Sequence, residues 1–546
     1  MNTPERAQHH REETTKMFRQ ITLAAALAAG TACAAWAADP QSGGTLNFVA
    51  PYGSSFGTLD IHTSPSTQDE FPAKAIHRSL YQWNSEESRP ELELATEVEA
   101  SDDRTVHTYK LRENAVFHNG TPLTADDVVY SYERVANPAN AFPGARYFSD
   151  LVGFDAFVKG EAEHIEGIEK IDDHTIALHY NNPTEPGYDL MKTNAAIYPA
   201  GLADDPGFIS HPIGLGPFKF VENVPGSRVV VEKFDDFYKD GQPYLDKINI
   251  VLLGDASARD VAFRNKEIDV SVLGPSQYVA YQADPELKDN LLEVAEVYTR
   301  HIGFDPDFEP FSKKEVRQAF NHAINADLII EKLVKNKAYR ASGWLPISSP
   351  AFDKDMAPYA YDPEKAKKLL ADAGYPDGFD FEITATQNES WGLTIVEAII
   401  PMLREVGIRA TAKPVESSVL AEIVPQGDFQ AFMWSNLSGP DDYGIMKCYY
   451  SKTPQSSCNY TEFNNAEFDK LFEAAGDEAD AAKKTDLLRQ ANNIVQEEAP
   501  HWFFNYNKAV MAYQPWLHGL QANATELAIQ NYEELWIDDT APDSRK

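Results

Sequence analysis

Positive charge is scarce in this chain of 546 residues, in which 48 lysines and arginines stand against 84 aspartates and glutamates. The formal net charge of −36 at pH 7 argues against nucleic acids and anionic membranes as partners, because both would be repelled. Disorder is excluded as well, since 43% of the residues are hydrophobic and the chain has 25 tyrosines and 29 phenylalanines. The length suffices for two or three domains with substantial cores.

Metal-ligand patterns are also missing. The 14 histidines include no His-Glu-x-x-His or comparable spacing, so neither a metal nor a cofactor is expected. One catalytic motif is present in form, because residues 53–57 read Gly-Ser-Ser-Phe-Gly, the pattern of a serine hydrolase elbow. That elbow requires a helix directly after it, which residues 58–60 do not indicate. We expect a loop here and keep a secreted hydrolase as the remote alternative.

The N-terminal apolar run, residues 21–29, is too short to span a bilayer stably. It follows a short basic start at residues 17–20, and residues 35–37 (Ala-Trp-Ala) form a small-x-small cleavage site. Residues 1–38 are therefore predicted to be an export signal, with the mature chain starting near Ala38.

Two alternatives stay open for this N-terminus. Met17 is a second candidate start, in which case residues 1–16 would not belong to the protein. Cys33 raises the alternative of a lipoprotein, although residues 30–32 before it (Gly-Thr-Ala) lack the leucine-like residue of a lipobox.

Cysteine is rare, with three residues in the whole chain. Cys448 and Cys458 enclose a short polar loop. In an oxidising, exported compartment such a pair is more typical of a disulfide than of a metal site. The sequence therefore predicts a bond between them, and two free thiols are the alternative.

Residues 110–134 predict a strand, a tight turn and the start of a helix. Asn119-Gly120 is a turn dipeptide, because glycine adopts a positive φ at no steric cost. Thr124 is positioned to cap the helix, and Asp127 in its first turn faces the positive end of the helix dipole. Valine and tyrosine at helical spacing then supply an apolar face. Physical chemistry alone gives a strand–turn–helix unit here and no function.

As a pattern, the same stretch resembles the signature of the family 5 extracellular solute-binding proteins, the peptide and nickel class that serves ABC importers. Arg112, Phe117, Gly120 and the pair Asp127-Val128 match positions of that signature. Further resemblances to the same family follow in family order at residues 43–62, 212–220, 266–270, 316–325, 361–375 and 494–500.

This resemblance implies an α/β fold of the periplasmic-binding-protein-like class (type II, cluster C), with two lobes, a hinge and an extra domain inserted in the first lobe. The alternation of strand-like and helix-like segments after residue 229 also fits an α/β fold. In the family's layout, residues 43–82, 209–300 and 510–540 form lobe 1, residues 83–208 the extra domain, and residues 301–509 lobe 2.

The function that the resemblance implies is capture of a small solute between the lobes, hinge closure, and delivery to an ABC permease in the inner membrane. The expected protein is a periplasmic monomer that catalyses no reaction and binds no nucleic acid. Its expected solute is a peptide or a peptide-like compound.

One departure from the family bears on that solute. Members that bind peptides usually carry an aspartate shortly after a tryptophan, and its carboxylate pairs with the α-amino group of the peptide. The corresponding position here is Leu437. A buried ammonium that lacks its partner costs roughly 2–5 kcal/mol. Asp441 or Asp442 could replace the aspartate only by a loop shift, so an oligosaccharide or glycoside is the alternative solute.

Aromatic platforms suit both kinds of solute, because peptide side chains and apolar sugar faces stack on them. The resemblance places Trp391 and Trp434 along the cleft, and Arg300 is the candidate partner of an anionic ligand group. Core packing is the alternative role for each tryptophan, and an interlobe salt bridge for the arginine. The predicted ligand-binding residues are Phe56, Arg300, Trp391, Trp434, Asn436, Asp441, Asp442 and Tyr443, with Tyr52 and Trp344 as further aromatic candidates.

Overall fold

The structure, a computed structural model, describes residues 39–546 except 54, 65, 388–390, 438 and 479. The predicted export signal with Cys33 lies outside the described residues, and so does the side chain of Leu437. The contacts divide the chain after Gln41, and the unit Ser42–Lys546 holds every element described below. Across the described residues, no helix is both long and apolar enough to cross a membrane.

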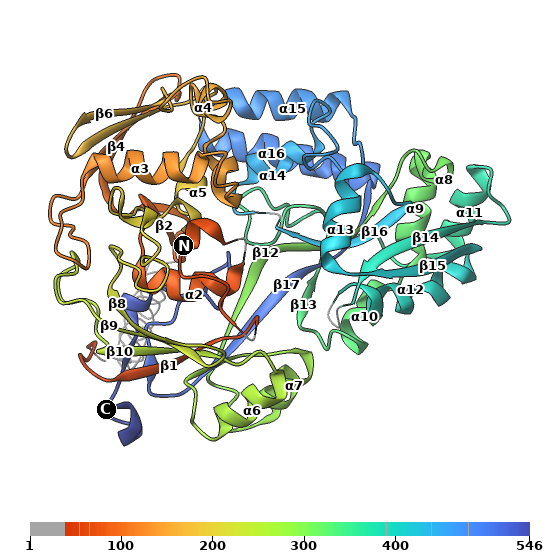
Figure 1. The fold of residues 1–546 in the computed structure, drawn as a ribbon. Helices are drawn as coiled ribbons and strands as arrows, with labels where there is room; N and C mark the ends of the chain where they lie inside the picture. Colours follow the sequence, from red (N-terminus) through yellow and green to blue (C-terminus); the bar gives the residue numbers. More distant parts are fainter. Residues whose placement is uncertain (1–38, 54, 65, 388–390, 438, 479) are drawn as a thin grey trace, which may run out of the picture. The chain divides into compact units, whose positions relative to one another are not determined.

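The first sheet has the strand order β1-β10-β9-β8 (Figure 1). Strand β1 (Thr45–Ala50) runs parallel to β10 (Lys247–Leu252), while β9 (Arg228–Lys233) and β8 (Phe218–Val224) are antiparallel. Strand β10 alternates buried and less buried residues, as expected for a sheet with one face on a core. Helix α2 (Thr67–Ile76) covers β8 and β9 and adds its apolar face to that core.

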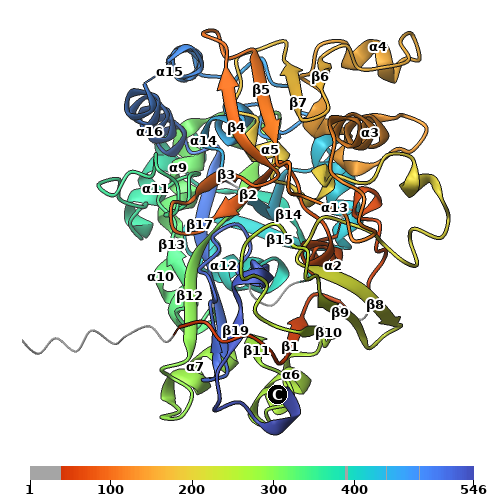
Figure 2. The ribbon, with the colours of Figure 1, turned by 90° about the vertical axis from the view of Figure 1, so that its left-hand side faces the viewer.

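The second sheet, in the order β4-β5-β7-β6, is antiparallel throughout (Figure 2). Its strands are β4 (Ala95–Ala100), β5 (Val106–Leu111), β7 (Thr175–His179) and β6 (Ile168–Asp172), and helix α3 (Ala125–Ala136) contacts β6. A separate hairpin is formed by β2 (Tyr81–Asn84) and β3 (Arg89–Leu92).

The start of α3 is as the sequence predicts. Thr124 is the N-cap, and the carboxylate of Asp127 accepts hydrogen bonds from the Thr124 backbone nitrogen at 2.8 Å and hydroxyl at 2.9 Å. Gly120 in the preceding turn has a φ of +82°, a value that side chains with a Cβ rarely adopt. Val128 and Tyr132 are fully buried in the core of this region.

The third sheet has the order β11-β17-β12-β16-β14-β15. Strand β14 (Phe379–Thr386) is parallel to β15 (Ile408–Val415) and β16 (Ala431–Leu437). The helices that accompany these strands include α9 (Lys314–Ala323), α11 (Pro363–Asp372) and α12 (Leu393–Glu405).

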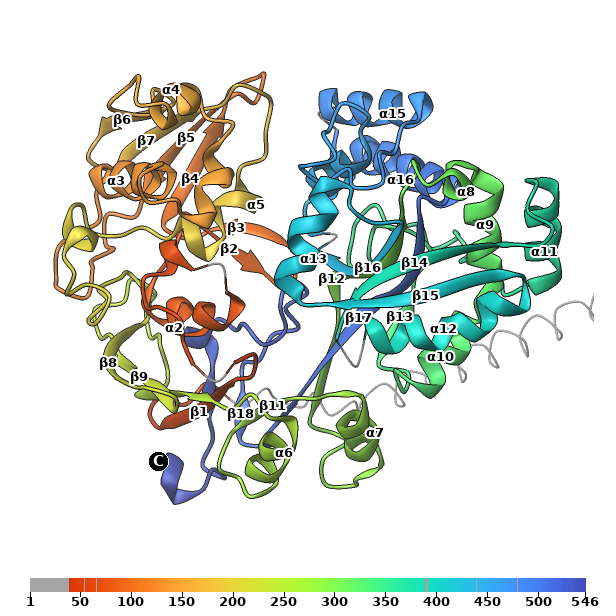
Figure 3. The same ribbon diagram turned by 45° about the vertical axis from the view of Figure 1, so that its right-hand side comes forward.

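Two long strands, β12 (Leu291–Phe304) and β17 (His501–Tyr513), pair with each other and connect the two largest cores (Figure 3). The C-terminal part of β17 packs in the core of the first sheet, whereas Phe304 of β12 and Trp502 of β17 are buried in the core of the third. The register of the pair shifts between Ala295 and Thr299. The pair is thus a two-stranded connection with an irregularity part-way along it.

Local predictions elsewhere agree with the structure. The carboxylate of Asp362 accepts a hydrogen bond from the backbone nitrogen of Lys365 at 2.9 Å and so caps α11. Cys448 and Cys458 form the predicted disulfide, with Cα atoms 5.0 Å apart. No helix follows residue 57 directly, since the next element is the short 3-10 helix Ile61–Thr63, so the described residues of the Gly-Ser-Ser-Phe-Gly motif, 53 and 55–57, lie in a loop.

Candidate ligand-binding cavity

A cavity of about 330 Å³ lies between helix α2 and the β12 side of the third sheet. It is lined by residues from several segments far apart in the sequence, namely Ile61, Ser64, Ser66, Thr67, Glu70, Lys74, Trp83, Pro143, Arg146, Tyr147, Met191, Lys192, Thr193, Asn194, Tyr298, Pro440, Asn523, Thr525, Glu526 and Ile529. This volume lies at the lower end of the range typical of small-molecule sites. Three basic side chains and two acidic ones stand among these residues.

Helix α2 presents two of the charges. Ser66 caps the helix by accepting a hydrogen bond from the Gln68 backbone nitrogen at 3.2 Å. Glu70 and Lys74 are four residues apart and therefore lie on one face of the helix, the face toward the cavity. Phe71 belongs to the core of the first sheet instead. The amphipathic sequence of α2 thus turns an acid and a base toward the cavity.

The ammonium groups of Lys74 and Lys192 are sparsely paired. Burial, together with the nearby charge of Arg78, lowers the pKa of Lys74 to about 8. Burial also lowers the pKa of Lys192, which Glu70 and Asp189 only partly offset. Within the described part of the chain, neither Nζ atom has a hydrogen bond or an ion pair.

The acidic side of the cavity is Glu526. Its carboxyl accepts a hydrogen bond from the Tyr52 hydroxyl at 2.6 Å. Burial raises the pKa of Glu526 to about 8, and the nearby carboxylate of Glu296 contributes to the increase. Glu296 lies in the irregular part of β12 and accepts hydrogen bonds from the Leu527 backbone nitrogen and the Asn507 side chain. At neutral pH Glu526 is therefore mainly a neutral hydrogen-bonding group.

The predicted ligand residues do not line this cavity, although two of them have neighbours that do. Arg300 follows Tyr298 by two positions in the sequence. Its side chain is buried and donates a hydrogen bond to the Asn507 side chain at 2.9 Å. Burial lowers the pKa of Arg300 to about 10. Asp441 directly follows Pro440 and caps the short helix α14 (Asp442–Met446).

Other members of the predicted set make contacts within the third-sheet region. Asp442 accepts hydrogen bonds from the Ser349 hydroxyl at 2.8 Å and the Ala351 backbone nitrogen at 3.0 Å. Burial raises its pKa to about 6. The ring of Tyr443 stacks on Phe472 with 4.5 Å between the ring centroids.

The predicted aromatic platforms also have protein partners. The ring of Trp434 stacks on Tyr460 at 5.8 Å between centroids, and the neighbouring Asn436 side chain is 2.9 Å from His301 Nε2. Trp391 packs against the core of the third sheet and Phe56 against that of the first. Their roles toward a ligand stay predictions.

Sequence reasoning missed Lys74, Lys192, Arg146, Glu70 and Glu526. One signal was available, because Lys74 interrupts an apolar stretch of α2 whose neighbours are buried. Lys192 and Glu526 lie in segments without a pattern of their own, so only the folded chain brings them to one cavity.

Comparison with known proteins identifies the relatives of this chain. The family model "Bacterial extracellular solute-binding proteins, family 5 Middle" matches residues 89–457. The glutathione-binding protein GsiB of Shigella dysenteriae serotype 1 (strain Sd197) is 27% identical over 491 residues, which cover 86% of this chain and 91% of that protein.

Solved structures give the same answer for the fold. DppA from Helicobacter pylori, in complex with the peptide STSA, superposes with a TM-score of 0.73 at 23% identity and covers 91% of this chain and 98% of its own. The protein AgaA from A. tumefacien R10, in complex with agropinic acid, has a TM-score of 0.72 at 26% identity, with coverage of 91% and 99%. The predicted two-lobed type II periplasmic-binding-protein fold is confirmed, and the chain belongs to the bacterial extracellular solute-binding proteins, family 5.

Proposed function

We propose that this protein is the periplasmic solute-binding component of an ABC importer and that it captures an amino-acid-derived solute of the peptide type. The supporting observation is the cavity of about 330 Å³ with its charged lining. Tyr298 and Pro440 of the third-sheet region face α2 and Glu526 across this cavity. Rotation about β12 and β17 would open and close it, and the closed form would be delivered to the permease.

The relatives support an amino-acid-derived solute. The first is named for glutathione, the second holds a peptide and the third holds agropinic acid. Leu437 cannot pair with an ammonium group, but Glu526 supplies a carboxyl to the cavity from another segment. A peptide-type solute therefore does not depend on an aspartate at position 437.

An oligosaccharide or glycoside remains the second candidate, because Trp83, Tyr147 and Tyr298 line the cavity and aromatic rings stack on sugars. The charges favour the first candidate. A neutral sugar would add no counter-charge for the desolvated ammonium groups of Lys74 and Lys192, which Glu70 only partly balances, and this is unfavourable.

Thermal unfolding with a ligand panel tests the proposal. The protein would be expressed as the full chain, purified from the periplasm and mixed with glutathione, di- to tetrapeptides and oligosaccharides. A true ligand at a hundred times its Kd stabilises the native state by about 2.7 kcal/mol and so raises Tm. A rise with sugars alone would replace the peptide proposal with the glycoside alternative, and no rise with any compound would overturn both.

The hydrolase alternative has its own test. Mass spectrometry of the bound compound should recover it unchanged after long incubation, with wild-type protein and with Ser55→Ala alike. Conversion of the compound by the wild type, abolished in Ser55→Ala, would show an enzyme instead.

A further inference from the structure

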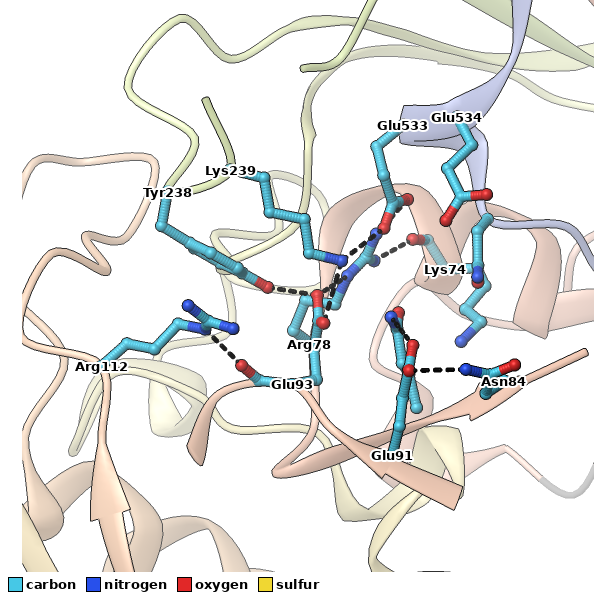
Figure 4. A network of polar contacts seen from close by, with 12 residues as sticks. Lys74, Arg78, Asn84, Glu91, Glu93, Arg112, Tyr238, Lys239, Glu533 and Glu534 are labelled. Carbon is cyan, nitrogen blue, oxygen red and sulfur yellow. Dashed lines mark hydrogen bonds and ion pairs between the residues drawn. The ribbon is translucent and has the colours of Figure 1, made fainter. Parts of the chain in front are cut away.

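The way in which charged side chains are paired around α2 bears on the net charge of the solute. Arg78 lies four residues after Lys74 in the sequence, just beyond the end of α2, and belongs to a closed network with two acids and a second base (Figure 4). Its guanidinium is 3.3 Å from the Glu93 carboxylate and 2.6 Å from that of Glu533. Lys239 approaches the same two carboxylates at 2.9 and 3.1 Å. Two acids therefore neutralise two bases, and all four side chains are at most 23% exposed.

Lys74 is the surplus charge beside this network. The carboxylates of Glu93 and Glu533 are committed to Arg78 and Lys239, and no hydrogen bond from the described residues reaches Lys74 Nζ. Lys74 lines the cavity instead. Of these two bases, Arg78 just beyond the end of α2 is held by two ion pairs, whereas Lys74 on α2 has neither an ion pair nor a side-chain hydrogen bond within the described residues.

The residues that line the cavity also carry more basic than acidic side chains. Lys192 and Arg146 add two positive charges, and among the described residues the Arg146 side chain donates its one hydrogen bond to the Tyr147 hydroxyl, at 2.9 Å. Glu70 is the one lining acid that interacts electrostatically with both lysines. Glu526, on another segment, is already engaged by the Tyr52 hydroxyl.

We propose, on the basis of the function proposed above, that the solute is net anionic and that Lys74 and Lys192 hold one of its acid groups. The matching compounds are amino-acid derivatives with more acid than ammonium groups, such as an acidic dipeptide. An acid group that accepts from two desolvated ammonium groups gains charge-assisted hydrogen bonds, which are about twice as strong as neutral ones. The raised pKa of Glu526 agrees, because a neutral carboxyl there adds no counter-charge for the lysines beyond that of Glu70.

Matched ligands test this directly by isothermal titration calorimetry. Ala-Glu and Ala-Gln have nearly the same shape and differ by one negative charge, so Ala-Glu should bind at least tenfold more tightly. Glutathione should likewise bind at least tenfold more tightly than its diethyl ester. Equal affinity within either pair, or tighter binding of Ala-Lys than of Ala-Glu, would overturn the inference while leaving a peptide-binding function in place. No binding of any of these compounds would remove the proposed function together with the inference.

Substitution of the two lysines tests whether they cause the preference for Ala-Glu over Ala-Gln. Lys74→Met and Lys192→Met should each weaken Ala-Glu at least tenfold and change Ala-Gln by less than threefold, whereas Lys192→Arg should keep the preference. Lys368→Met is the matched control, because Lys368 is exposed on α11 and pairs with Asp372. Thermal unfolding of each variant shows whether it folds. An equal loss for both dipeptides in the methionine variants would mean that the lysines do not select the acid group.

Discussion

Two charged regions meet at the end of α2 and differ in how their charges are paired. In the closed network, the charges of Arg78 and Lys239 outweigh burial and hold the pKa of Glu533 at about 2. In the cavity, burial dominates and lowers the pKa of Lys74 to about 8. Arg78 and Lys74 are four residues apart in the sequence and both are desolvated by burial, so the contrast arises from the partners that the fold supplies rather than from depth alone. Under the inference above, the paired charges stabilise the fold and the sparsely paired ones bind the solute.

The largest effect should come from breaking the network. Arg78→Met would leave Glu93 and Glu533 buried with only Lys239 between them, a loss on the order of 3–5 kcal/mol for a broken buried pair. Urea unfolding measures the free energy directly. Lys74→Met, four residues earlier in the sequence, is the control and should leave stability unchanged or raise it, because it removes a poorly paired base. Similar losses in both variants would contradict the distinction between the two regions.

As the pH falls, buried histidines elsewhere should reduce the stability of the protein before the carboxylates of this network are protonated. Burial lowers the pKa of His301 to about 4, from an ordinary value of 6.5. The unfolded chain therefore binds the extra proton first, and stability falls as the pH decreases from 6.5 to 4. At pH 5 this loss is about 2 kcal/mol for one such histidine. The stabilisation linked to Glu533 is present above its unfolded pKa of 4.5 and is lost only as the pH falls from there through about 2.

Urea unfolding at pH 7 and pH 5 separates these contributions. His301→Gln should flatten the loss between the two pH values, even if the variant is less stable at both. The exposed His164 is the control with the opposite sign, because Glu133 raises its pKa. Its small stabilisation is present below its unfolded pKa and is lost as the pH rises through the folded value. An unchanged pH dependence in His301→Gln would contradict the assignment.

A smaller effect, on ligand affinity, is expected from substitution of Glu526 in the cavity. If the ammonium group of the solute binds beside Glu526 and thereby ionises its carboxyl, Glu526→Gln should weaken Ala-Glu roughly tenfold, or about 1.4 kcal/mol. N-acetylated Ala-Glu lacks that ammonium group and should bind the variant and the wild type equally. Calorimetry measures both. A loss that is the same for the two ligands would mean that Glu526 contacts another part of the solute or only supports Tyr52.

Much of the fold was predictable because its determinants are local. The cap at Thr124, the capped helix after Asp362 and the short Cys448–Cys458 loop each depend on residues a few positions apart. The cavity is different, since Lys74, Lys192 and Glu526 have no shared sequence pattern and meet only after the chain folds.

The predicted ligand-binding residues also show the limit of prediction from sequence. A family pattern locates Trp434 and Asp442 in the segment near the cleft, but it does not show what their side chains contact. Trp434 stacks on Tyr460, and Asp442 is held by Ser349 and Ala351. Pro440, between them in sequence, is the residue that reaches the cavity. Long-range packing decides which member of a segment faces a ligand.

The smallest effect concerns polar contacts between helix α16 with its preceding residues and the region of the second sheet. Lys484 Nζ in helix α16 (Ala481–Glu498) lies 3.0 Å from the carboxylate of Glu185, near the second sheet. Arg104 donates a hydrogen bond to the Gly476 carbonyl at 3.1 Å and lies 3.5 Å from Glu185. The contacts of Lys484 with Glu185 and of Arg104 with Gly476 join two regions that would separate if the chain rotated about β12 and β17, so they should stabilise the closed form alone.

Their contribution should nevertheless be small, because the Glu185 side chain is 55% exposed and exposed ion pairs contribute about 0.2–1 kcal/mol. Lys484→Met should therefore weaken the preferred ligand about two- to fivefold, mainly through faster dissociation, and the effect should shrink at high salt. Lys452→Met is the control, since its exposed pair with Glu473 lies within one region. Stopped-flow dissociation measures both variants. Equally faster dissociation in the control would mean that Lys484 acts only through the overall surface charge of the protein. Faster dissociation in Lys484→Met alone would assign the ion pair to closure, a role different from the one proposed for Lys74 and Lys192.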